Sequence, residues 1–192
     1  MHKQTNFDQT NKWVTQMINS QIHEIKFIKG AYGFENFGVC AFNDQFKTTA
    51  QSFRNIHYHL RDTKQTHTWI AIYIPSATNK YREQMGLHSI REYTWHIAAF
   101  QELINVEALN YKDYGLDERW PLGIPAGRIY YFSKPCLPLV NLGENFAKLV
   151  QQAAHQSAAT AIPGDIEKTI LEIVSEEILL EAPKTSPKSS TT

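Results

Sequence analysis

The chain has 192 residues, of which 42% are apolar and 12% aromatic, and this is enough to bury one hydrophobic core. Nineteen basic residues balance nineteen acidic ones, so no global positive field exists to hold a nucleic acid. The first thirteen residues lack the apolar core of a signal peptide, and no apolar run approaches the roughly 20 residues that cross a bilayer. We therefore expect a cytoplasmic protein without a membrane span, whose two cysteines remain thiols.

The N-terminal part predicts two helices separated by an irregular segment. Apolar residues spaced three to five apart predict a helix over residues 8–27. The next segment, KGAYGFENFGVCAF, is rich in glycine and aromatic residues, which favours a loop that runs into a short buried element. Asn43 or Asp44 is suited to cap a second helix that ends near the polar run RDTKQTH.

The middle of the chain predicts a strand followed by a helix. Residues 68–75 combine β-branched and aromatic types and end at a proline, which is typical of a buried central strand. Ser89 and Glu92 have the spacing of a capping box, in which the hydroxyl and the carboxylate each bond a backbone N–H of the first turn. This spacing predicts a third helix over residues 89–104.

The last third predicts a strand pair and two helices. Residues 128–132 and 137–142 are predicted to pair, and Pro138 places the second strand at an edge. Helical stripes follow over residues 146–153 and after Pro163. Together the elements predict an α+β fold in which a small, largely antiparallel sheet is covered by helices from both ends of the chain. Residues 1–181 would form one domain, and residues 182–192 a disordered tail, because they offer too few apolar side chains to offset ordering entropy.

Cys40 and His67 are the candidate catalytic pair. A thiol just ahead of a helix is acidified by the helix dipole, and a histidine at the start of a strand could deprotonate it, as in cysteine hydrolases. Spacing indicates no third residue that would orient the histidine. A buried structural cysteine explains the same residue without catalysis.

Other histidines are candidates for binding rather than for acid–base chemistry. His57 and His59 form a His-apolar-His triplet, but the surrounding pattern is helical and no acidic partner follows, so we predict no metal site. A neutral imidazole is a good axial donor to haem iron, and His96 is the candidate on the third predicted helix. A hydrogen-bonded boundary histidine is the alternative interpretation. The motifs CxxC, HExxH and GxSxG and a glycine-rich phosphate loop are absent from the sequence.

The order of motifs over residues 37–142 resembles the YqcI/YcgG family. The similar features are a Phe-Cys-small segment, a strand ending in proline, a helix with a Phe-Gln pair, a Trp-Pro that leads to an Ile-Pro, an aromatic strand, and a Pro-x-x-Val-Asn-like strand. In this chain these positions are Phe37, Cys40 and Ala41; Pro75; Glu92, Tyr93, Phe100 and Gln101; Trp120, Pro121, Ile124 and Pro125; Tyr131 and Phe132; and Pro135, Val140 and Asn141.

The resemblance implies haem-dependent oxygenation of a nitrogen atom in a small guanidino or amino metabolite. It implies Cys40 or His96 as the axial ligand, with Trp120 and Tyr131 lining the pocket. The chain departs from the family after the second strand, where a histidine-proline and an arginine-rich turn are replaced by GENFAKLV. If the missing residues bind haem or substrate, the activity is lost.

The C-terminal segment supports a different class of function. SEEILLE followed by a Ser/Thr/Lys tail is similar to the C-terminal export signals of type IV secretion effectors. A solvated helix end and a disordered tail explain the same letters without export. The alternatives to an oxygenase are thus a non-enzymatic interaction protein, either an exported effector or an adaptor with a protein partner, and a Cys40/His67 hydrolase.

Overall fold

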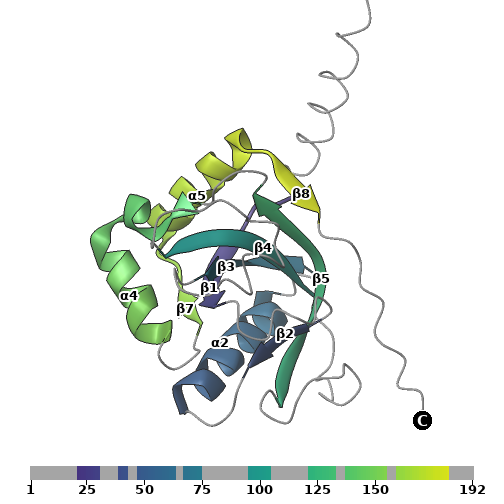
Figure 1. Cartoon of the computed structure of the whole chain (residues 1–192). Coiled ribbons are helices and arrows are strands. Elements are labelled where there is room, and N and C mark those ends of the chain that lie inside the picture. The colour runs from purple at the N-terminus through teal and green to yellow at the C-terminus, as the bar shows by residue number, and fades with distance from the viewer. Residues whose placement is uncertain are drawn as a thin grey trace, which may run out of the picture.

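The computed structural model describes residues 21–30, 39–42, 47–63, 67–74, 95–104, 121–132, 137–154 and 159–181. Figure 1 shows the arrangement of the strands and helices. The strands are β1 (Ile25–Gly30), β2 (Val39–Phe42), β3 (His67–Ile74), β4 (His96–Ile104), β5 (Leu122–Phe132), β6 (Leu137–Pro138), β7 (Thr160–Ala161) and β8 (Leu179–Glu181). The helices are α2 (Lys47–Thr63), α4 (Glu144–Ala154) and α5 (Gly164–Glu176), with a 3₁₀ turn η2 (Leu139–Leu142).

The eight strands belong to one sheet in the order β2-β5-β4-β3-β1-β7, while β6 pairs with β4 and β8 with β5. Most neighbours are antiparallel, but β1 and β3 run parallel. Parallel neighbours need a crossover connection, and α2 lies in the chain between these two strands. The prediction of a small sheet covered by helices from the two chain ends is therefore wrong, because the sheet is large and mixed and α2 comes from the chain interior.

The sheet curls around α2 (Figure 1). Phe27 on β1 contacts His59 of α2 with ring centroids 5.6 Å apart, and Phe42 on β2 contacts Phe53 of α2 at 5.7 Å. In a flat sheet β1 and β2 would lie about 19 Å apart, because they are four strand positions from each other. Yet the Lys29 Nζ on β1 lies 5.2 Å from the centroid of the Phe42 ring. The two flanks of the sheet therefore approach each other over the helix.

Alternation along the strands divides the side chains between two faces. We call the face against α2 the inner face, and by register it carries Phe27, Lys29, Cys40, Phe42, Thr68, Ile70, Ile72, Gln101, Leu103, Ile129 and Tyr131. The opposite, outer face carries Trp69, Ala71, Tyr73, Phe100, Glu102, Arg128 and Tyr130. Both faces are buried in the centre: every residue of β4 except Ile104 is buried.

Several predicted elements are confirmed. The strand over residues 68–75 corresponds to β3, and the short buried element at the end of the glycine-rich segment to β2. The helix after Asp44 is α2, and its buried residues are Thr49, Ile56 and Leu60. The two C-terminal helices are α4 and α5.

Three predicted elements are wrong. The helix over residues 8–27 lies largely outside the described residues, but its end is occupied by strand β1. The helix over residues 89–104 is contradicted by β4, whose run HIAAFQELI is buried on both sides and shows no strict period of two. The predicted pairing of residues 128–132 with 137–142 does not form, since β6 pairs with β4 and residues 139–142 form η2.

One polar side chain connects the C-terminal helix to the first strand. Glu167 of α5 is 7% exposed; its Oε1 accepts a hydrogen bond from the Ile25 backbone N–H at 3.0 Å, and its Oε2 lies 2.5 Å from the Lys26 Nζ. The Ile162 N–H donates to the Lys26 carbonyl beside it. These bonds satisfy backbone groups of β1 beyond the two residues paired with β7. None of the described helices is both long and apolar enough to cross a bilayer.

Candidate functional site

The structure separates the two residues of the predicted catalytic pair within the sheet. Cys40 lies in β2 and the backbone of His67 in β3, with β5 and β4 between these strands. The His67 side chain lies outside the described part of the chain. The strand order thus gives no support to a hydrogen bond between the thiol and the imidazole, which the hydrolase hypothesis requires.

Cys40 is 2% exposed and lies in a paired strand. Burial raises the pKa of its thiol to about 11, and the nearby Lys29 opposes this shift only in part. Burial also lowers the pKa of Lys29, which is 3% exposed and donates from Nζ to the Gly30 carbonyl at 3.2 Å. A reactive cysteine needs the thiolate, which burial disfavours here. The surroundings of Cys40 therefore do not fit a catalytic nucleophile.

The other predicted haem contacts are only partly brought together. Tyr131 is half-buried on the inner face. His96 is the first residue of β4 and is 1% exposed. Trp95 stacks on Tyr73 of the outer face, so alternation along the strand points His96 toward the inner face. His96 pairs with Ile74 and Pro138 at one end of the sheet, whereas Cys40 pairs with Ile124 near the start of β5 at the other. Trp120 lies outside the described residues.

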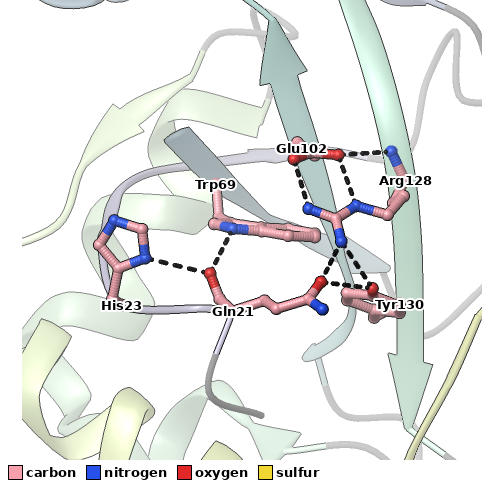
Figure 2. Close-up of polar contacts among 6 residues, drawn as sticks. All are labelled: Gln21, His23, Trp69, Glu102, Arg128 and Tyr130. Carbon is pink, nitrogen blue, oxygen red and sulfur yellow. Dashed lines mark hydrogen bonds and ion pairs between the residues drawn. The ribbon is translucent and has the colours of Figure 1, made fainter. Parts of the chain in front are cut away.

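An extensive polar cluster among the described residues lies on the outer face and was not predicted (Figure 2). The Arg128 guanidinium donates to both carboxylate oxygens of Glu102, from Nη2 to Oε1 at 2.7 Å and from Nε to Oε2 at 2.9 Å. The Arg128 backbone N–H donates to the same Oε2 at 2.9 Å. The Glu102 side chain is 4% exposed and that of Arg128 34% exposed. A bidentate pair of this kind fixes the orientation of both side chains.

Aromatic rings and Gln21 complete this cluster. The guanidinium carbon of Arg128 lies 5.6 Å from the Trp69 ring centroid and 5.9 Å from that of Tyr130, and the two rings stack at 5.1 Å. The Gln21 side-chain oxygen accepts hydrogen bonds from Arg128 Nη1 and from the Tyr130 hydroxyl, and its backbone carbonyl accepts one from Trp69 Nε1. The cluster thereby attaches the start of the described chain to the sheet.

The electrostatics of the cluster indicate a structural role. The hydrogen bond to Glu102 is the main cause that raises the pKa of Arg128 above its usual value, so the guanidinium stays charged. Burial is the main cause that raises the pKa of Tyr130, so its hydroxyl stays protonated. Neither group can then serve as a base near neutral pH. A glutamate inside an otherwise apolar strand, QELI, is the sequence signal that could have indicated a buried ion pair.

Two open depressions are lined by described residues. One, of about 580 Å³, lies between residues 23–26 and α5, and most of its lining is charged. The other, of about 540 Å³, lies where α4 and α5 begin, and we call it the α4–α5 groove. It is lined by Leu142, Gly143, Glu144, Asn145, Phe146, Leu149, Pro163, Asp165 and Ile166.

The α4–α5 groove combines apolar side chains with acidic ones. Leu149 is 45% exposed, and Val140 of the preceding turn η2 is 52% exposed. Glu144 and Asp165 are the charged residues among the described side chains that line the groove. Lys148, 3.8 Å from Glu144, does not line it. The groove therefore offers an apolar surface beside two carboxylates.

Across the described residues, no group of three or more His, Cys, Asp or Glu side chains could hold a metal ion. Comparisons with protein-family models, with curated proteins and with solved structures gave no match for this chain.

Proposed function

We propose that the chain is a non-enzymatic interaction protein that binds a short segment of a partner protein in the α4–α5 groove. The observation that supports this proposal is the apolar lining of the groove, in which Leu149 is exposed and Ile166 is half-buried against the core. Exposed apolar surface rimmed by polar groups is typical of protein interaction sites. The groove volume of about 540 Å³ also lies in the range of pockets that enclose several side-chain-sized groups.

The charge of the groove indicates the chemistry of the partner segment. Glu144 and Asp165 lie on the rim, and the described lining contains no basic side chain to neutralise them. Glu144 is 84% exposed and its contact with Lys148 is long, at 3.8 Å, so its carboxylate is accessible to an incoming cation. We infer a segment that presents one or two bulky apolar side chains next to lysine or arginine. Opposite charges across an interface favour the correct partner and speed its association.

A peptide-binding experiment tests the proposal. An amphipathic peptide with leucines at helical spacing and flanking lysines is compared, by fluorescence anisotropy, with a peptide in which glutamates replace the lysines. We expect the lysine peptide to bind and Leu149→Asp to weaken its affinity about tenfold or more, which corresponds to about 1.4 kcal/mol. Ile178→Asp is the matched control, because Ile178 is 47% exposed and does not line the groove. Equal losses in the two variants, or equal binding of both peptides, would contradict the proposal.

The export version of this function concerns residues 182–192, which lie outside the described chain. It stays a prediction, and deletion of these residues tests it: an exported effector loses translocation while its unfolding midpoint is unchanged. The oxygenase hypothesis also stays a prediction, and an absorption spectrum of haem-supplemented protein decides it, because bound haem gives a Soret band.

A further inference from the structure

Two polar side-chain atoms on the inner face are buried and have no hydrogen-bond partner among the described residues. They are the hydroxyl oxygen of Thr68 on β3 and the side-chain nitrogen of Gln101 on β4. Both residues are 1% exposed. Because Gln101 pairs with Ile70, two residues from Thr68 on the same strand, the two side chains are diagonal neighbours about 7–8 Å apart at the backbone. They therefore lie next to each other on the face of the sheet that packs against α2.

The apolar surroundings of Thr68 and Gln101 make it costly to leave these two polar atoms without a partner. Ile70, Leu103 and Ile129 flank the two residues on the inner face, and all three are buried. A buried donor or acceptor without a partner loses its hydration and gains nothing in return, and such groups are rare in folded proteins. A single small molecule that hydrogen-bonds to both the Thr68 hydroxyl and the Gln101 nitrogen would satisfy both groups.

We propose that the inner face holds a small molecule with an acceptor oxygen, bound between Thr68 and Gln101. The Gln101 amide nitrogen donates to that oxygen, and the Thr68 hydroxyl either donates to it or accepts from it. The chemistry fits an ordered water molecule or the hydroxyl or carboxyl group of a small organic compound. Two polar partners are the minimum that holds a buried water.

Near-isosteric apolar substitutions test this site. Thr68→Val and Gln101→Met remove the hydrogen-bonding groups with little change in volume. If a molecule bridges the two side chains, each variant lowers the urea midpoint of unfolding, and the double variant loses less than the two single losses combined. Thr68→Ser keeps the hydroxyl and should keep the coupling. Thr48→Val, at an exposed position of α2, is the control for the substitution itself.

Measurements on the unaltered protein identify the source of the oxygen. A nuclear Overhauser effect between water and the Gln101 amide protons identifies water, whereas a co-purified mass in native mass spectrometry identifies an organic compound. Either result supports the site. The proposal is overturned if both signals are absent, or if Thr68→Val and Gln101→Met leave the midpoint unchanged or raise it additively, as expected for unfilled polar groups.

Discussion

Glu102 illustrates how one side chain can support the middle of a sheet. Its carboxylate accepts three hydrogen bonds from Arg128, two from the guanidinium and one from the backbone N–H. The backbone bond lies where the pairing of β4 and β5 is irregular, between Gln101 and Leu103. The carboxylate thus replaces a partner that the strand pairing does not supply at this point.

Removal of this carboxylate should destabilise the fold. We expect Glu102→Ala to lower the free energy of unfolding by about 2–3 kcal/mol, less than for a fully enclosed pair because Arg128 is one-third exposed. Urea denaturation measures the change. Glu172→Ala is the matched control, because Glu172 pairs with Lys168 at 3.9 Å with both side chains largely exposed, and it should cost at most about 0.5 kcal/mol. Similar losses in the two variants would contradict a special role for Glu102.

At the scale of elements, the two glycines near the groove differ in what they require. Gly143 follows η2 with a φ of +107°, its N–H donates to the Val140 carbonyl, and its carbonyl accepts from Ala147. Only glycine adopts this backbone conformation without strain. Gly164 begins α5, has no such φ, and a Cβ atom there would meet nothing within 4 Å. The same residue type is thus needed at one helix start and dispensable at the other.

A pair of alanine substitutions tests this contrast. Gly143→Ala should destabilise the protein by about 1–3 kcal/mol, because alanine must hold a strained φ. Gly164→Ala should stabilise it by about 0.4–1 kcal/mol, because alanine reduces the conformational freedom of the unfolded chain. Thermal unfolding of both variants measures the difference. If both substitutions shifted the midpoint in the same direction, the conformational argument for Gly143 would fail.

The elements that could be predicted from sequence are those with a local signal. The apolar stripes of α4 and α5 and the β-branched run of β3 have periods that short windows reveal. β4 could not be recognised, because a strand buried on both faces has no alternation and its HIAAFQELI run also fits a helix. A capping-box spacing just before it added a misleading helix signal.

At the scale of the whole molecule, the size of the sheet could not be predicted because its pairings are distant in sequence. β8 pairs with β5 and β1 with β3 across stretches that no local pattern reports. The candidate site residues follow the same rule. Residue type and the family resemblance suggested Cys40 and His96, but which face and which end of the sheet they occupy depends on the strand order.

Lys29 is buried where the two flanks of the curled sheet approach each other, and its burial should make the stability of the fold depend on pH. The pKa of Lys29 is lowered by burial, so between its folded pKa and 10.5 the unfolded chain binds more protons and stability rises with pH. The pKa of Cys40 is raised from 9.0 to about 11, so its contribution is present below pH 9 and lost as the pH rises through 11. Below pH 9 the contribution of Cys40 is constant, so a change of stability with pH in this range can be assigned to Lys29 rather than to Cys40.

The variant Lys29→Met isolates the lysine. Relative to this variant, the unaltered protein should gain unfolding free energy as the pH rises through the interval that ends at pH 9, by at most about 1.4 kcal/mol per pH unit. Urea denaturation at several pH values measures the difference between the two proteins. A difference that stays constant over this interval would show that Lys29 keeps its proton in the folded state.

The contact of Glu167 with β1 joins residues 141 positions apart in the chain. Its carboxylate binds a backbone N–H at the edge of β1, a strand that β7 pairs with at two residues. A chain that ended before α5 would lack Glu167, and this edge of β1 would expose unpaired backbone groups. Other extended chains can pair with such an edge. We therefore expect that loss of α5, the last of the described helices, favours insoluble oligomers over a less stable monomer.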